Sequence, residues 1–142
     1  MADVFNTTIA PITDSKSTVA GDYFNNTIEG NGGAILLNEN GSVDLLGGAF
    51  INNSAKDSGG AITAMWNSGG INTINGFFLN NHANKRGGAI ANVHNSDTLK
   101  GMFISNYVNM DYNGSEIVGG GALFNDEYSS DYSTTIQNIQ AD

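Results

Sequence analysis

The fold is decided by Gly76-Phe77-Phe78-Leu79-Asn80-Asn81, which is followed, eleven residues after its first glycine, by Gly87-Gly88-Ala89-Ile90. Both phrases recur three more times in near copies, beginning at Gly21 and Gly32, at Gly48 and Gly59, and at Gly101 and Gly120. The leading glycines follow one another after 27, 28 and 25 residues. A fixed period of this length is typical of an array of stacked repeats.

Composition selects strands over helices for the repeat. The chain of 142 residues carries 19 Gly and 21 Asn, and both residue types are unfavourable inside helices. The apolar residues come in short runs separated by Gly, Asn, Asp and Ser, as strands between tight turns do. A further short segment precedes each leading glycine, as Ile71–Ile74 does, with a fifth version at 133–136. We predict an all-β chain of about four turns with three short strands in each, coiled as a right-handed parallel β-helix.

Equivalent residues of successive turns should lie about 4.8 Å apart and form ladders along the coil. We expect a ladder of side-chain amides from Asn26, Asn53, Asn81 and Asn106. We expect an aromatic stack of Tyr23, Phe50, Phe78 and Phe103, and an aliphatic stack of Ile35, Ile62, Ile90 and Leu123. The pattern leaves open whether Tyr23 or Phe24 points inward. The paired glycines suit a corner that requires a positive φ or a close approach of two backbones.

Two segments depart from the repeat. Residues 1–16 hold the only proline and no copy of either phrase, so they are expected to cap the solenoid of residues 17–142 or to dock into a neighbour. Residues 107–118 make the fourth turn eight residues longer and predict an inserted loop. The candidate binding residues of this loop are Tyr107, Asp111, Tyr112, Asn113 and Glu116. Of these, Asp111, Asn113 and Glu116 are weak candidates for calcium, because their spacing is not that of an EF-hand.

The distribution of charge limits the partners. The net charge is −9, and all five basic residues precede Gly101. Nucleic-acid binding requires a basic surface, so we expect no nucleic-acid partner. The chain has no cysteine and no apolar run long enough to cross a bilayer, so we expect neither disulfides nor membrane insertion. The two histidines fall in different phases of the repeat, and no cofactor or metal site is expected.

The two phrases resemble the Gly-Gly-Ala-Ile and Phe-x-x-Asn motifs of polymorphic outer-membrane proteins and related autotransporter passenger domains. Here the second motif reads Phe-x-Asn-Asn, and the resemblance covers roughly residues 21–125. It implies a right-handed β-helix displayed outside a bacterial cell. In that family the motifs build the scaffold, so the resemblance does not identify a ligand.

We therefore expect a non-enzymatic structural or adhesive β-solenoid at the surface of a bacterium or outside it. Its end turns would stack head to tail into a filament, since 17–19 and 134–136 are copies of the same strand. A host protein or a glycan is the other partner to consider. Two alternatives remain: a fragment of a longer autotransporter adhesin, and a carbohydrate-active β-helix enzyme or tailspike-like module.

Overall fold

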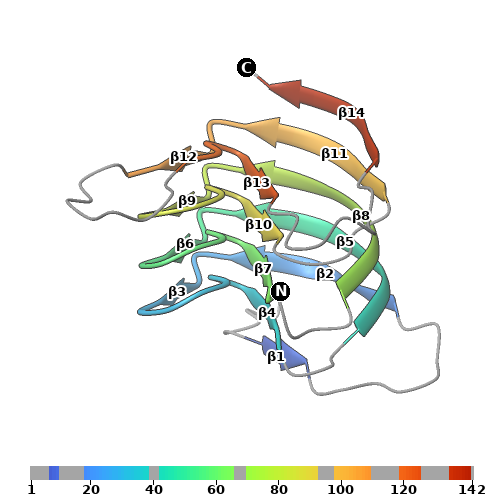
Figure 1. The fold of residues 1–142 in the computed structure, drawn as a ribbon, viewed down its shortest axis with the longest axis horizontal. Helices are drawn as coiled ribbons and strands as arrows, with labels where there is room; N and C mark the ends of the chain where they lie inside the picture. Colours follow the sequence, from blue (N-terminus) through green and yellow to red (C-terminus); the bar gives the residue numbers. More distant parts are fainter. Residues whose placement is uncertain are drawn as a thin grey trace.

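The computed structural model describes residues 7–9, 18–38, 42–65, 70–92, 98–109, 119–125 and 135–141. In these residues the chain is all-β, and it winds as a parallel β-solenoid made of three sheets (Figure 1). Every strand pairs in parallel with the equivalent strand of the next turn, as expected from a repeat of 25 to 28 residues. The handedness of the coil stays a prediction.

Sheet A holds the strands that contain the Ile of each Gly-Gly-Ala-Ile phrase or its equivalent. Its strands in order are β1 (Thr7–Ile9), β4 (Ile35–Leu37), β7 (Ile62–Ala64), β10 (Ile90–Asn92) and β13 (Leu123–Asn125). The predicted aliphatic ladder lies here, because Ile35 pairs with Ile62, Ile62 with Ile90 and Ile90 with Leu123. Thr7–Ile9, from the expected cap, extends this sheet by pairing with Ile35–Leu37. The rest of the cap, 1–6 and 10–16, lies outside the described residues.

Sheet B holds the longest strands. They are β2 (Thr18–Phe24), β5 (Ser42–Ile51), β8 (Gly70–Leu79), β11 (Thr98–Ile104) and β14 (Thr135–Ala141). The segment before each leading glycine and the phrase after it form one continuous strand here, so their prediction as two separate strands was wrong. The glycine does not end the strand: Gly48 has a φ of 123°, which glycine adopts readily, and its pairing with Gly21 and Gly76 continues the ladder. Val19 pairs with Leu46, Leu46 with Ile74, Ile74 with Leu99 and Leu99 with Ile136, so the segments before the leading glycines pair from turn to turn.

Sheet C is formed by the third strand of each turn, which follows the paired asparagines and was not predicted. Its strands are β3 (Thr27–Ile28), β6 (Ser54–Ala55), β9 (His82–Ala83) and β12 (Tyr107–Val108). Because Tyr107 pairs with His82 and Val108 with Ala83, the fourth turn is still in register at these residues. The prediction that the insertion begins at Tyr107 was therefore wrong, and the extra residues fall within 110–118, outside the described residues.

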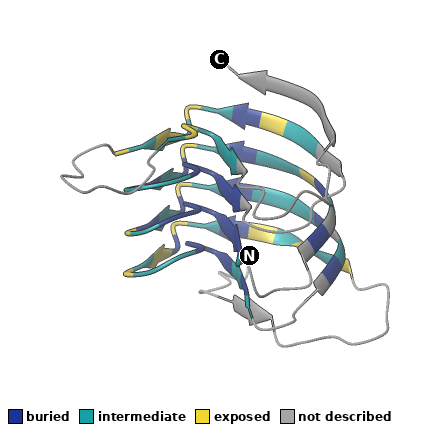
Figure 2. Ribbon diagram, in the orientation of Figure 1, coloured by how far each residue is buried: buried dark blue, intermediate teal, exposed yellow. Residues whose placement is uncertain are grey.

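A layer is defined here as one strand from each sheet. The four layers are, in order, β2 to β4, β5 to β7, β8 to β10 and β11 to β13, with β1 below the first layer and β14 above the fourth (Figure 1). The sheets enclose a core that runs along the axis and is most completely buried in the middle layers (Figure 2). Phe50 and Phe78, at the centre of this core, are 0 % exposed.

The two glycines of each pair meet different requirements at the corner before sheet A. Gly59 has a φ of 65°, in the left-handed region, where a Cβ is unfavourable. At Gly60 a Cβ would collide with the carbonyl oxygen of Gly88 in the layer above. Positive φ therefore applies to Gly59, whereas close approach applies to both, because a Cβ on Gly59 would also collide with the carbonyl oxygen of Ile62.

Candidate binding surfaces

The second asparagine of each Asn-Asn pair, or its equivalent in the fourth copy, forms a hydrogen-bonded ladder inside the rod. Asn26 Nδ2 donates to Asn53 Oδ1 at 2.8 Å, Asn53 Nδ2 to Asn81 Oδ1 at 2.9 Å, and Asn81 Nδ2 to Asn106 Oδ1 at 2.9 Å. The backbone N–H of each lower asparagine donates to the same Oδ1 above it. Each amide above the first layer also donates to a carbonyl oxygen below, as Asn53 does to Tyr23.

This ladder is incomplete at its lower end. Asn26 is 2 % exposed, yet its Oδ1 has no hydrogen-bond partner. In every higher layer the equivalent oxygen accepts two N–H groups from the layer below. Because an unpaired buried acceptor costs about 1 to 3 kcal/mol, the ladder is an open site for one further asparagine or another donor.

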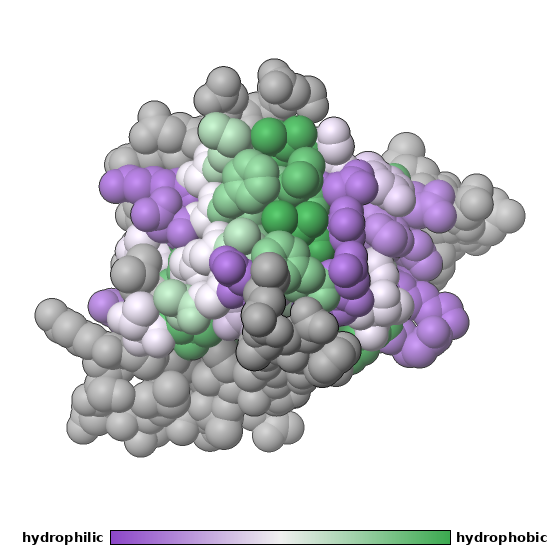
Figure 3. All heavy atoms as spheres, turned by 180° about the vertical axis from the view of Figure 1, so that it is seen from behind, coloured by the Kyte–Doolittle hydropathy of each residue, from purple (hydrophilic) through white to green (hydrophobic). Residues whose placement is uncertain are grey.

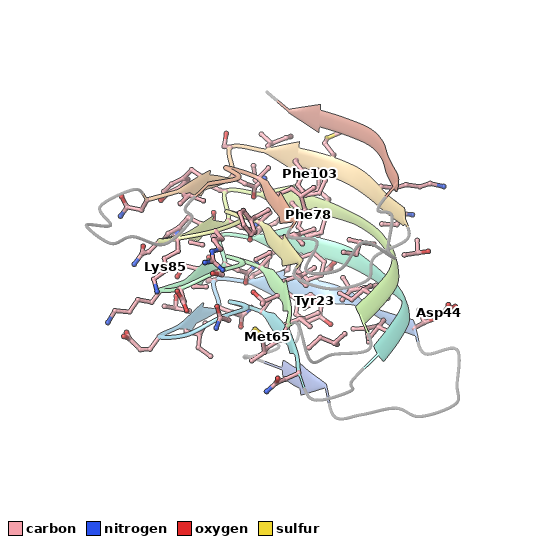
Figure 4. All side chains as sticks on the ribbon, viewed as in Figure 1. Tyr23, Asp44, Met65, Phe78, Lys85 and Phe103 are labelled. Carbon is pink, nitrogen blue, oxygen red and sulfur yellow. The ribbon has the colours of Figure 1, made fainter. Side chains whose placement is uncertain are left out.

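The aromatic side chains also form one stack inside the rod, and Tyr23, not Phe24, is the inward residue of the first layer. The ring centroids of Tyr23 and Phe50 lie 4.8 Å apart, those of Phe50 and Phe78 4.9 Å, and those of Phe78 and Phe103 4.7 Å. Adjacent rings are within 6° of parallel. Tyr23, Phe78 and Phe103 lie one above another in Figure 4. Burial at the lower end of this stack raises the pKa of the Tyr23 hydroxyl.

The first asparagine of each pair turns the corner between sheets B and C. Asn25, Asn52, Asn80 and Ser105 have φ values from 51° to 59°. Asparagine tolerates this left-handed conformation better than other residues that have a Cβ. The three asparagines form a second, exposed ladder, in which Asn52 Nδ2 donates to Asn25 Oδ1 at 3.3 Å and Asn80 Nδ2 to Asn52 Oδ1 at 3.1 Å.

The outer surface of sheet C and the residues that follow it carry charged and aromatic pairs between layers. Lys56 Nζ lies 2.6 Å from Glu29 Oε2, and Lys85 Nζ lies 2.8 Å from Asp57 Oδ1. The hydrogen bond to Glu29 and its charge raise the pKa of Lys56. Such exposed pairs stabilise a fold only slightly. Each pair places a basic group beside an acidic one, so this surface carries charges of both signs.

Tyr107 is the one predicted binding residue of the insertion that the structure describes. It is 47 % exposed and its ring stacks on His82 at 5.0 Å. Partial burial lowers the pKa of His82. The other predicted loop residues, Asp111, Tyr112, Asn113 and Glu116, lie outside the described residues, and so do the three calcium candidates among them. The part of the chain that is described contains no group of three or more His, Asp or Glu side chains placed to hold a metal ion.

An apolar surface on the outside of sheet B was missed by the sequence reasoning. We call it the outer stripe and define it by two ladders that face away from the core, Ala49, Phe77 and Met102, and Phe24, Ile51, Leu79 and Ile104. Figure 3 shows it as a green column with hydrophilic atoms beside it. The apolar residues on both sides of each inward aromatic, as in Phe77-Phe78-Leu79, were the signal for it.

Comparison with known protein families finds a repeat that matches one turn of this chain. Residues 75–93 match the family described as the Chlamydia polymorphic membrane protein repeat. No curated protein and no solved structure shows a significant match to the chain. No helix among the described residues is long and apolar enough to span a membrane. The matched segment holds the third copy of both phrases, so this turn of the solenoid is similar to the repeat of those membrane proteins.

Proposed function

We propose that the chain is a non-enzymatic structural or adhesive module of a bacterial cell surface, and that its end layers stack head to tail on further copies. The match of residues 75–93 to a membrane-protein repeat from Chlamydia supports the bacterial surface. The observation that carries the stacking is the buried, unpartnered Oδ1 of Asn26 at the lower end of the amide ladder.

The two ends of the rod are complementary. Among the described residues, sheet A alone is extended below the first layer, by β1, and sheet B alone is extended above the fourth layer, by β14. When two copies meet end to end, β14 of one and β1 of the next can therefore occupy one layer without competing for the same position. Each would pair with an edge strand of the other copy, and edge strands readily pair in this way.

The amide ladder also differs between its two ends, as the sheets do. Its lower end holds a buried oxygen acceptor at Asn26, whereas Asn106 at its upper end donates through Nδ2 to the Phe78 carbonyl and retains a second N–H. In a stack with a shared layer these two groups lie about 9.6 Å apart, so a polar group of the shared layer has to join them. A contact between unlike ends is heterologous, so repeating it builds an open filament.

Sedimentation velocity and negative-stain microscopy across a concentration series test this proposal. Filaments should lengthen with concentration, and Asn26→Asp should shift the protein towards single rods, because aspartate cannot donate to Asn53 Oδ1 and so loosens the end layer. Asn25→Asp, on the exposed ladder one residue away, is the matched control and should still assemble. Circular dichroism of both variants checks that the fold survives.

Single particles of constant mass at all concentrations would contradict head-to-tail stacking. They would favour a longer adhesin in which preceding and following turns of the same polypeptide cover both ends. Repeating the series with calcium tests the three loop candidates. Cleavage of neutral or acidic polysaccharides in a reducing-end assay would instead contradict the non-enzymatic assignment.

A further inference from the structure

We propose that the outer stripe is a lateral interface on which a second copy of this chain packs face to face, with the two rods antiparallel. The stripe is a continuous apolar surface that faces away from the core. Met102 within it is 41 % exposed, and its other large side chains, such as Phe77 and Leu79, are only partly buried. Contiguous exposed apolar surface on a soluble protein marks an interaction site.

The shape of the stripe suits a second sheet. Its residues occupy alternate positions of β2, β5, β8 and β11 and stack in register through all four layers. Two such faces can interdigitate at about 10 Å, as the two sheets of a β-sandwich do. A flexible or highly curved partner would match a straight ladder less well than another straight ladder does.

Charge decides the direction of the second rod. Asp22, exposed in the first layer, is the equivalent of Ala49, Phe77 and Met102 in their ladder. Lys100, in the fourth layer, occupies the neighbouring outward position on β11. In an antiparallel pair the first layer of one copy faces the fourth layer of the other, so each Asp22 lies near a Lys100 of the second copy. Parallel rods would bring the two Asp22 carboxylates together.

The expected size of the contact sets its strength. Four layers at about 4.8 Å and the two outward positions of the stripe at about 6.6 Å give roughly 250 Å² per copy, or about 500 Å² in total. This area is below that of a stable specific complex, so the dimer should be weak and should form reversibly at high protein concentration. Rods that are also stacked end to end would present many stripes in a row, and their lateral pairing would be strengthened by avidity.

Charge reversal tests the interface by sedimentation equilibrium. Asp22→Lys and Lys100→Asp should each weaken the dimer by about tenfold or more, because each places like charges together. The double variant should restore the affinity to within about twofold of the original, as only a direct contact would. Lys56→Asp makes the same charge change on the outside of sheet C and should leave the dimer unchanged. Leu79→Ser should abolish it while the circular dichroism spectrum is retained.

Three results would overturn the proposal. A protein that sediments as a monomer at millimolar concentration has no such interface. Single charge variants that associate as the original does would assign any association to the ends of the rod. A tighter dimer from Asp22→Asn would indicate parallel rods, in which this carboxylate is repulsive. Because neither Asp22 nor Lys100 contributes to the amide ladder, failure here leaves the end-stacking proposal intact.

Discussion

Asn53 illustrates how single residues hold the layers together. Its side chain donates upward to Asn81 Oδ1 at 2.9 Å and downward to the Tyr23 carbonyl at 3.0 Å, and it accepts from Asn26 below. Asn53 is 0 % exposed, so each of these groups is removed from water and depends on the others. A repeated buried asparagine is therefore explained by the need to satisfy polar groups along the axis of the rod.

Replacing Asn53 by alanine should lower the free energy of unfolding by about 3 kcal/mol or more, because it leaves several buried donors and acceptors unpaired. Asn52→Gly is the matched control on the exposed ladder. Glycine keeps the left-handed φ of 55° and loses only surface hydrogen bonds, so it should cost less than about 1 kcal/mol. Urea unfolding of the two variants measures the difference, and equal losses would show that the buried ladder is not important.

His82 gives the fold a weak dependence on pH. Partial burial lowers the pKa of its imidazole below the ordinary 6.5, so the unfolded chain takes up this proton first as the pH falls. The stabilising contribution is complete above pH 6.5 and is lost as the pH falls from 6.5 through the lowered value. We expect His82→Gln to show a flatter loss of stability over this window, measured by thermal unfolding at pH 7.5 and at successively lower pH. If the melting temperature of His82→Gln fell with pH as steeply as that of the original protein, the role of His82 would be contradicted.

At the scale of the element, the corner glycines determine how closely the turns can stack. A Cβ on Gly60 would meet backbone atoms of Gly88 and His82 in the layer above, and backbone cannot move aside as a flexible side chain can. By contrast, a Cβ on Gly30 would have nothing within 4 Å. Both glycines lie in the segment that joins sheet C to sheet A, yet only Gly60 is constrained by the neighbouring layer.

Gly60→Ala should therefore destabilise the protein severely, by more than about 3 kcal/mol, or prevent folding. Gly30→Ala should be neutral or stabilise by up to about 1 kcal/mol, because alanine restricts the unfolded chain. Thermal unfolding of the pair measures the contrast. A folded Gly60→Ala variant with the original melting temperature would contradict the close stacking of the corners.

The ladders could be predicted from the sequence because each consists of a residue type that recurs at the same position of every repeat. The strand boundaries could not be predicted in this way. The strand continues through Gly48 because it pairs with Gly21 below and Gly76 above, although its φ of 123° is not that of an ordinary strand. This tertiary pairing overrides the usual interpretation of glycine as a break. The two-residue strands of sheet C, such as Ser54–Ala55, have no apolar alternation of their own and exist only through pairing with their neighbours.

At the scale of the whole molecule, the rod has two kinds of surface that could bind another copy, its two ends and the outer stripe. Among the described residues, the end layers have strand edges without a pairing strand and the buried, unpaired oxygen of Asn26, and the outer stripe presents apolar side chains. The sequence pattern predicted stacking at the ends from repeated strands. It left open which of Tyr23 and Phe24 faces outward, so the residues of the stripe were not assigned, although either orientation places apolar side chains such as Phe77 or Phe78 outside.

Electron cryomicroscopy of assembled protein, with the axial repeat read from the layer lines, tests the central claim most directly. If β14 of one copy and β1 of the next share a layer, each copy adds five layers, or an axial repeat of about 24 Å at about 4.8 Å per layer. A repeat of about 29 Å would mean that the ends abut without sharing a layer, and it would contradict the complementary ends. The absence of filaments at any concentration would contradict stacking altogether.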